Sequence, residues 1–258
     1  MNQPVRILII LTTLWLGACT TEVIRTGVDY KKAAEANAKL GLGYMEQGNF
    51  ELAMSKLKKA LNLDQDCTIG HHYIAELYRR LGEMKKAEQH YRRAMELDKD
   101  DTDIQNNYGV FLCDQGKYKE ADGHFEKVLE NPFYTTRSKV YENIALCAKR
   151  KGDLKRAEHH FNKALLMNSR LPKSLLEMAI LNHDRGDHTS AYSYYQRFIQ
   201  YGQQTAASLW MGVLLESKEG NRTKAASYAL LLKKQFPQSR EAVLAGRFLE
   251  KHKRSKLR

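Results

Sequence analysis

Residues 68–101 read TIGHHYIAELYRRLGEMKKAEQHYRRAMELDKDD and contain the pattern that decides the fold. A large residue precedes a small one at Ile74-Ala75, and Gly82, Ala87 and Tyr91 follow. Glycine can close a helix because it tolerates a left-handed backbone. The stretch therefore predicts two helices joined at Gly82. Ala87 is expected where these helices cross closely, and Tyr91 where they meet a neighbouring pair.

The pattern recurs along most of the chain. Glycines lie at positions 48, 82, 116, 152, 186 and 220, at intervals of 34, 34, 36, 34 and 34 residues. Five residues after each glycine stands an alanine: Ala53, Ala87, Ala121, Ala157, Ala191 and Ala225. Four residues further stand Leu57, Tyr91, Phe125, Phe161, Tyr195 and Ala229. Such a fixed period predicts stacked units, each of which buries its apolar face only against its neighbours.

The period and residue types resemble the tetratricopeptide (TPR) repeat, which implies an all-α, right-handed α-solenoid. We place six units at 34–67, 68–101, 102–135, 138–171, 172–205 and 206–239. The large-small pair of the first helix is Leu40-Gly41 in unit one, but Gly212-Val213 replaces it in unit six. Terminal repeats are commonly atypical. Residues 240–258 are predicted to form a capping helix and a basic tail, with Leu244, Phe248 and Leu249 facing the last unit.

A two-residue insertion separates units three and four. Pro132 ends a helix there, and two aromatic residues, Phe133 and Tyr134, follow it. Either these rings contact a partner or they tuck against the next helix pair, and the sequence leaves both readings open.

The N-terminus predicts export and lipidation. Arg6 precedes an apolar run of ten residues, 7–16, which is shorter than the roughly 20 residues that a membrane-spanning helix needs. Residues 1–18 therefore read as a signal peptide. The segment 16–19, Leu-Gly-Ala-Cys, resembles a bacterial lipobox and implies lipidation of Cys19. Two or more acyl chains hold a protein stably at a bilayer, and residues 19–33 are expected to form a lipidated tether.

Motifs for catalysis are absent from the sequence, so we expect a protein that is not an enzyme and that has no cofactor. The pairs His71-His72 and His159-His160 cannot each hold one metal ion, because adjacent helical residues point about 100° apart. The formal net charge of +12 permits binding to nucleic acid or to membrane phosphates. The predicted export argues against nucleic acid, and we expect a monomer.

Three cysteines lie within the repeats, at Cys67, Cys113 and Cys147. Cys113 and Cys147 fall near the ends of the first helices of units three and four, which are neighbours. A disulfide forms only when the two Cα atoms approach within roughly 7 Å, and neighbouring first helices come that close. In an oxidising compartment this pair is a candidate disulfide. The alternative is three separate thiols.

The first helices of a TPR array line its concave face, which typically accepts an extended peptide or a helix of a partner. The groove candidates of units two to four are His72, Glu76, Arg79, Arg80, Asn106, Val110, Asp114, Glu142, Lys149 and Arg150. Unlike charges alternate here, and they either bind a partner or form solvated pairs within one helix. We expect reversal of Arg79 and Arg150 to preserve the fold.

The residue sequences of units three to five are more specific than the repeat pattern itself. Residues 106–113 (NNYGVFLC), 131–134 (NPFY), 142–147 (ENIALC) and 174–179 (SLLEMA) resemble the PilF/PilW family of type IV pilus biogenesis lipoproteins. The resemblance covers the lipobox and all six units. It implies a pilotin: an outer-membrane lipoprotein, facing the periplasm, that helps the pilus secretin reach the membrane and multimerise. The secretin subunit is then the expected partner. The alternative is a TPR lipoprotein adaptor for another envelope machine, serving cell-wall or outer-membrane-protein assembly.

Overall fold

The computed structural model describes the backbone of residues 29–256 and the side chains of residues 29–251. This part of the chain is all-helical. Its helices are α1 (Tyr30–Glu46), α2 (Phe50–Leu63), α3 (Thr68–Arg80), α4 (Met84–Leu97), α5 (Thr102–Asp114), α6 (Tyr118–Glu130), α7 (Arg137–Lys151), α8 (Leu154–Met167), α9 (Pro172–Arg185), α10 (His188–Tyr201), α11 (Ala206–Lys218), α12 (Arg222–Gln235) and α13 (Arg240–Lys256).

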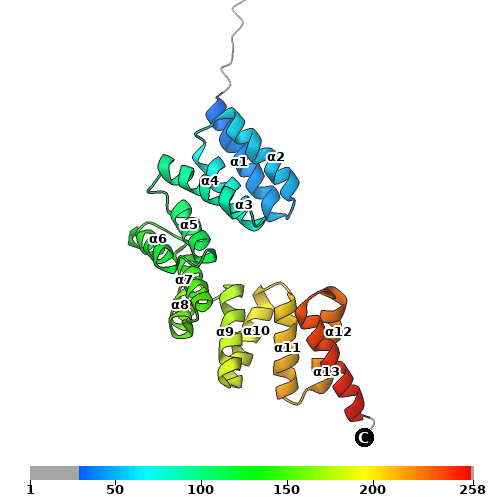
Figure 1. The fold of residues 1–258 in the computed structure, drawn as a ribbon. Helices are drawn as coiled ribbons and strands as arrows, with labels where there is room; N and C mark the ends of the chain where they lie inside the picture. The colour runs from blue at the N-terminus through cyan, green and yellow to red at the C-terminus, as the bar shows by residue number, and fades with distance from the viewer. Residues whose placement is uncertain (1–28, 257–258) are drawn as a thin grey trace, which may run out of the picture.

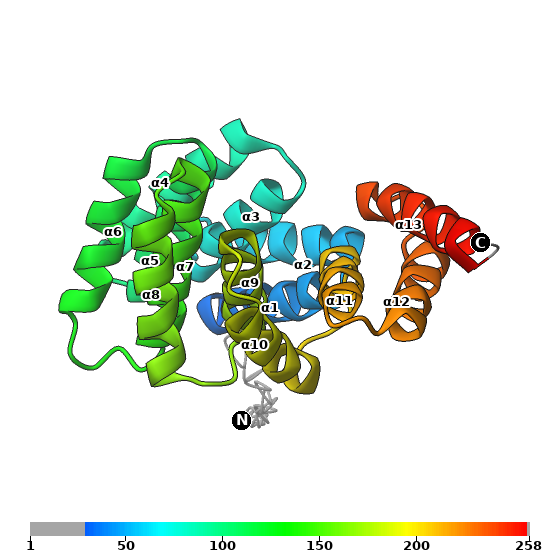
Figure 2. The same ribbon diagram turned by 90° about the horizontal axis from the view of Figure 1, so that it is seen from below.

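The helices form six consecutive pairs followed by α13, and the pairs stack into a TPR solenoid that curves into an open arc (Figure 1). Seen from below, α4 to α8 lie on the left, α1, α2, α9 and α10 lie in the middle, and α11 to α13 extend to the right (Figure 2). The expected signal peptide, residues 1–18, and the expected lipidation site Cys19 lie outside the described residues.

The six repeating glycines explain where each pair turns. Every one of them has a positive φ, between 73° and 88°, and a residue with a Cβ atom adopts this backbone only with strain. At each turn the glycine ends the first helix, and the second helix begins two residues later, as at Gly82 and Met84. The predicted role of these glycines is confirmed.

The core consists of the predicted repeat positions. All six alanines that follow the glycines are fully buried, and so are Tyr91, Phe125 and Phe161. A Cβ atom on Gly109 would stand 2.8 Å from Cε1 of Phe125, so only glycine lets this ring approach the first helix of its own unit. The aromatic residue therefore wedges against the small residue of the large-small pair.

One boundary and the burial of two leucines differ from those expected. Helix α1 starts at Tyr30 rather than at residue 34, because the side chain of Asp29 accepts a hydrogen bond from the backbone N–H of Lys32 and caps the helix. Leu40 is 52% exposed, because unit one has no preceding unit to cover it. In α13, Ala242 and Ala245 are buried, and Ala245 packs against the last unit together with the partly buried Phe248 and Leu249, whereas the partly buried Leu244 is not part of that cluster.

The stacking is not uniform along the solenoid. First helices of successive units pack directly on each other at α1/α3, α3/α5, α5/α7 and α9/α11, but α7 and α9 are not such a closely packed pair in the described part of the chain. Units four and five are joined mainly through α8 and α9. The concave side of this junction is therefore left more open.

Candidate functional site

The candidate site is the concave face that α3, α5 and α7 form, together with the start of α9. In Figure 1, α3 and α5 lie nearer the opening of the arc than α4 and α6. Residues of unit two reach residues of unit three on this face because successive first helices pack side by side. The side chains of the face are thus shared between units.

Glu76 is the centre of the polar contacts in unit two. Its carboxylate accepts hydrogen bonds from Arg79 at 2.8 and 2.9 Å, from Arg80 Nε at 3.0 Å and from the Tyr91 hydroxyl at 2.9 Å. Burial by itself would raise the pKa of Glu76, but the hydrogen bonds from the two arginines and the tyrosine outweigh it and lower that pKa. Glu76 therefore stays ionised and fixes both guanidinium groups.

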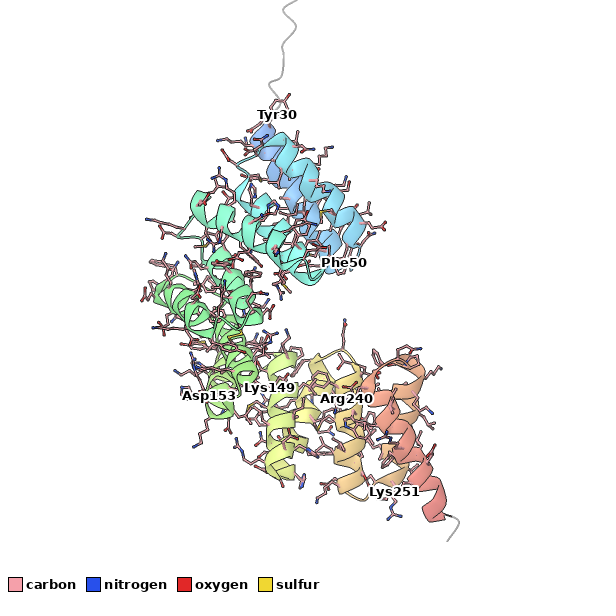
Figure 3. All side chains as sticks on the ribbon, viewed as in Figure 1. Tyr30, Phe50, Lys149, Asp153, Arg240 and Lys251 are labelled. Carbon is pink, nitrogen blue, oxygen red and sulfur yellow. A yellow bond between two sulfur atoms is a disulfide. The ribbon has the colours of Figure 1, made fainter. Side chains whose placement is uncertain are left out.

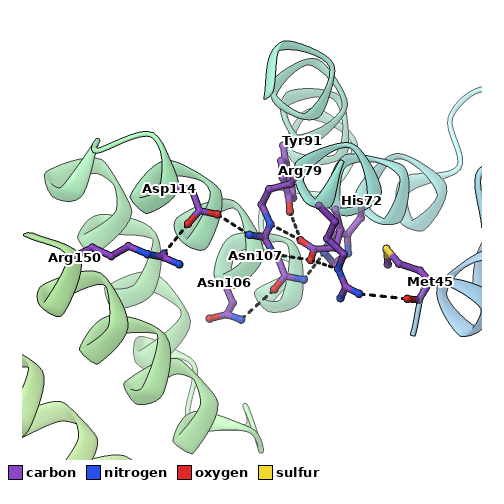
Figure 4. Close-up of polar contacts among 10 residues, drawn as sticks. Met45, His72, Arg79, Tyr91, Asn106, Asn107, Asp114 and Arg150 are labelled. Atoms are coloured by element: carbon purple, nitrogen blue, oxygen red, sulfur yellow. Dashed lines mark hydrogen bonds and ion pairs between the residues drawn. The ribbon is translucent and has the colours of Figure 1, made fainter. Parts of the chain in front are cut away.

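A second carboxylate, Asp114, links three units. Arg79 Nη1 lies 2.6 Å from Asp114 Oδ2, and Arg150 Nη1 lies 2.6 Å from Asp114 Oδ1. These contacts form a row of charged groups that also extends to unit one, where Arg80 donates to the backbone oxygen of Met45 at 3.4 Å. Figure 4 shows this line of charged groups running from Met45 to Arg150. It crosses the junctions between units one and two, two and three, and three and four.

A chain of hydrogen bonds between uncharged side chains lies beside the row of charged groups. Asn143 donates to Asn106 at 3.0 Å, Asn106 donates to Asn107 at 3.4 Å, and Asn107 donates to Nε2 of His72 at 2.8 Å. Burial lowers the pKa of His72, so its ring stays neutral and can accept this bond. Units two, three and four are thus also joined by side-chain amides.

The junction between α7 and α9 is bridged by polar contacts. Glu142 Oε2 accepts hydrogen bonds from Ser174 Oγ at 2.6 Å and from its backbone N–H at 3.1 Å. Lys149 forms an ion pair with Glu177, and Lys149 is labelled next to α9 in Figure 3. These groups connect two first helices that do not pack closely.

Cys113 and Cys147 are joined by a disulfide, with their Cα atoms 5.7 Å apart. The bond connects α5 to α7, directly beneath the charged row, and Arg150 Nη1 lies 3.8 Å from Cys113 Sγ. Cys67 is a buried free thiol. The disulfide holds units three and four at a fixed distance on the concave face.

Next to the disulfide lies a pocket of about 90 Å³. Its lining comes from all four helices of the candidate site: Arg79, Val110, Cys113, Asn143, Leu146, Arg150 and Lys173. Lys173 is the second residue of α9 and is exposed. The pocket opens where α7 and α9 separate.

The burial and pairing of the ten groove candidates differ from those that the sequence implied. His72, Glu76 and Asn106 are buried, so they hold their neighbours in place rather than offering a surface to a partner. The ion pairs are not confined to single helices, since Arg79 and Arg150 both bind Asp114. Reversal of both arginines would place four carboxylates near one another without the guanidinium groups that Glu76 and Asp114 bind. We therefore expect this double variant to be less stable than the wild type, whereas the sequence alone predicts an undisturbed fold.

Several functional positions were missed by sequence reasoning. Tyr91, Ser174 and Glu177 complete the contacts of the face, and Lys173 contributes to the pocket. Tyr91 was assigned only to the core, although a buried tyrosine hydroxyl needs a hydrogen-bond partner. Lys173 had no distinguishing signal, because lysine is also the second residue of α1, α4, α6 and α8.

The insertion between units three and four separates its two aromatic residues. Tyr134 packs against the core that units two to four share and donates a hydrogen bond from its hydroxyl to Asp103 at 2.9 Å. Its ring is thus tucked against the repeats, but its hydroxyl binds unit three, which precedes it, and not the next helix pair. Phe133 is 88% exposed.

Comparison with known proteins agrees with the repeat architecture. Residues 34–67 and 138–170 match the family model described as tetratricopeptide repeat, and residues 70–132 match YpiA-like, C-terminal tetratricopeptide repeats. The chain is also 34% identical over 238 residues to the type IV pilus assembly protein PilF of Pseudomonas aeruginosa, covering 91% of this chain and 94% of that protein. The chain belongs to the PilF/PilW family of type IV pilus assembly proteins.

Solved structures of PilF/PilW proteins have the same fold. The structure of Pseudomonas aeruginosa PilF superposes with a TM-score of 0.69 at 36% identity, covering 82% of this chain and 96% of that one. PilW, described as a widely conserved type IV pilus biogenesis factor, superposes with a TM-score of 0.68 at 26% identity, covering 82% of this chain and 98% of that one. The family resemblance expected from the sequence is confirmed.

Proposed function

We propose that this chain is a lipid-anchored pilotin: a non-enzymatic, monomeric scaffold at the periplasmic face of the outer membrane that promotes membrane localisation and multimerisation of the pilus secretin. Family membership, at 34% identity over nearly the whole chain, is the observation that carries the proposal. The concave face of first helices supports it, because TPR arrays bind partner segments there.

An anchor on Cys19 suits this task physically. Within residues 29–256, no helix combines the length and the apolar content that crossing a bilayer requires. Acyl chains on Cys19 would instead concentrate the scaffold at the membrane where the secretin ring must form, because each buried methylene contributes about 0.8 kcal/mol of membrane affinity.

The test is a deletion strain complemented with the wild-type chain. We expect the deletion to lose heat-resistant secretin multimers and twitching motility together, and complementation to restore both. A deletion strain that assembles secretin normally but shows defects in the cell wall or in outer-membrane proteins would contradict the proposal. It would favour an adaptor for another envelope machine.

A further inference from the structure

The pocket beside the disulfide has donors without acceptors. Arg79 uses Nε and both terminal nitrogens on Glu76 and Asp114. The contacts of Arg150 with Asp114 and Cys113 are made through Nη1, and its side chain is half exposed beside the pocket. Lys173 has no ion pair or hydrogen bond within that same part of the chain.

The local charge is positive. The guanidinium groups of Arg79, Arg80 and Arg150 share two carboxylates, Glu76 and Asp114, and Lys173 adds an unpaired ammonium group. The nearby Glu142 does not line the pocket and is held by Ser174. An excess of fixed cations in a concave site attracts and orients an anion.

The position of Lys173 is unfavourable for its own helix. The N-terminus of a helix carries partial positive charge, so a lysine in the first turn is repelled while an acidic residue is favoured. Glu142 partly compensates at this helix terminus, because it accepts a hydrogen bond from the backbone N–H of Ser174. Lys155 is likewise the second residue of its helix, so what distinguishes Lys173 is its place in the lining of the pocket.

The pocket admits a small group. Its volume of about 90 Å³ is enough for several water molecules and therefore for the carboxylate of one side chain. Val110 and Leu146 supply an apolar floor for the methylene carbons of such a side chain.

We infer that this pocket receives the carboxylate of an aspartate or glutamate side chain in an extended segment of a partner protein, held by Arg150 and Lys173. That the partner is the secretin subunit rests on the proposed function. The carboxylate lies across the α7/α9 junction and so ties units four and five together when the partner is bound.

The test uses the full-length lipidated protein in detergent on a peptide array. One half carries short overlapping peptides covering the periplasmic part of the secretin from the same cell. The other half carries unrelated sequences with Asp, Glu, Asn, Gln or Lys at one position. We expect binding to fall about tenfold when the acidic residue becomes its amide, which corresponds to the loss of one charged contact.

The variants are Lys173→Glu and, as a matched control, Lys155→Glu. Both lysines are exposed and lie near the start of a helix, but Lys155 is on α8, away from the pocket. A glutamate at position 173 suits the helix dipole, so the fold is retained. We expect Lys173→Glu to lose the acidic peptides and to prefer their lysine versions, while Lys155→Glu binds like the wild type.

The possible outcomes test the existence of the pocket and the identity of its partner separately. Acid-dependent binding that is sensitive to Lys173 but confined to the unrelated peptides supports the pocket and contradicts the secretin as partner. Secretin peptides that bind equally as acids and amides, or equally to the Lys173→Glu protein, overturn the pocket and leave the proposed function standing. Absence of binding on both halves also overturns the pocket.

Discussion

At the residue scale, Glu76 holds two arginines of its own repeat, and Asp114 holds arginines of the two neighbouring repeats. Glu76 lies at the back of the concave face with a side chain that is 12% exposed, and it accepts from Arg79, Arg80 and Tyr91. Removing one partner of a buried ion pair is costly because the remaining charges lose their counter-charge while staying out of water. Exposed pairs contribute far less.

We predict that Glu76→Ala lowers the free energy of unfolding by about 3 kcal/mol, since two arginines and a tyrosine hydroxyl lose their acceptor. The matched control is Glu88→Ala, which removes more exposed pairs with Arg92 on α4 and with Lys117 of the next unit and should cost about 1 kcal/mol or less. Urea unfolding followed by circular dichroism measures both. Equal effects of the two substitutions would show that Glu76 is no more than a surface group.

A half-buried histidine gives the fold a pH dependence. Burial, and secondarily the neighbouring His71, lowers the pKa of His90 to about 4, and the two Nδ1 atoms lie 2.9 Å apart. The unfolded chain takes up the proton near pH 6.5, its ordinary value, while the folded chain resists it until about pH 4. His90 therefore stabilises the fold fully above pH 6.5, and this contribution is lost as the pH falls through that range.

We predict that the urea midpoint of the wild type falls between pH 6.5 and pH 4 and that His90→Phe falls less steeply, because phenylalanine keeps the stacking on Tyr78 but cannot titrate. The exposed His159 provides the control, His159→Phe, which should retain the wild-type slope. If the slopes of His90→Phe and wild type coincide, another group is responsible.

At the scale of the elements, the junctions between units differ in what holds them. Units three and four have close packing of α5 on α7, a disulfide and the shared Asp114. Units four and five have no such close packing of their first helices in the described structure and are bridged by Glu142 with Ser174 and Lys149 with Glu177. The solenoid is thus more firmly fastened on the N-terminal side of the pocket.

We predict that Cys113→Ser with Cys147→Ser lowers the free energy of unfolding by about 3–4 kcal/mol, the loop-closure value for the 34-residue separation of these cysteines. Reducing the wild type should give the same loss. Alkylation of denatured, unreduced protein should label Cys67 but neither of the other two thiols of the repeats. Labelling of all three would mean that the chain carries free thiols.

At the scale of the whole molecule, the concave face and the start of α1 are separate regions, with partner binding proposed for the first and an anchor proposed before the second. Figure 3 places Tyr30, at the start of α1, and Lys251, on α13, at opposite ends of the arc. An anchor that precedes α1 would leave the face of α3 to α9 free to meet a partner at the membrane.

We predict that Cys19→Ser abolishes fatty-acid labelling and moves the protein from the outer-membrane fraction to the soluble periplasm, because the thiol that would carry the lipid is lost. Its circular dichroism should match that of the wild type, since the repeats begin after the tether. Metabolic labelling with a fatty-acid analogue, followed by membrane fractionation, is the measurement. A wild-type chain that takes up no label would refute lipidation.

The period of the sequence by itself determined the helix pairs, the six glycine turns and most of the core, because each of these depends on residues a few positions apart and recurs in every unit. The exposure of Leu40 departs from the pattern because covering that residue requires a preceding unit. What only the tertiary structure decided is how the charged first helices meet. Arg79 finds Asp114 at a separation of 35 residues and Lys149 finds Glu177 at 28, so the pairing depends on how far adjacent units rotate and approach. For the same reason the pocket at Lys173 exists only because α7 and α9 stand apart, a property of the packed units that no single repeat encodes.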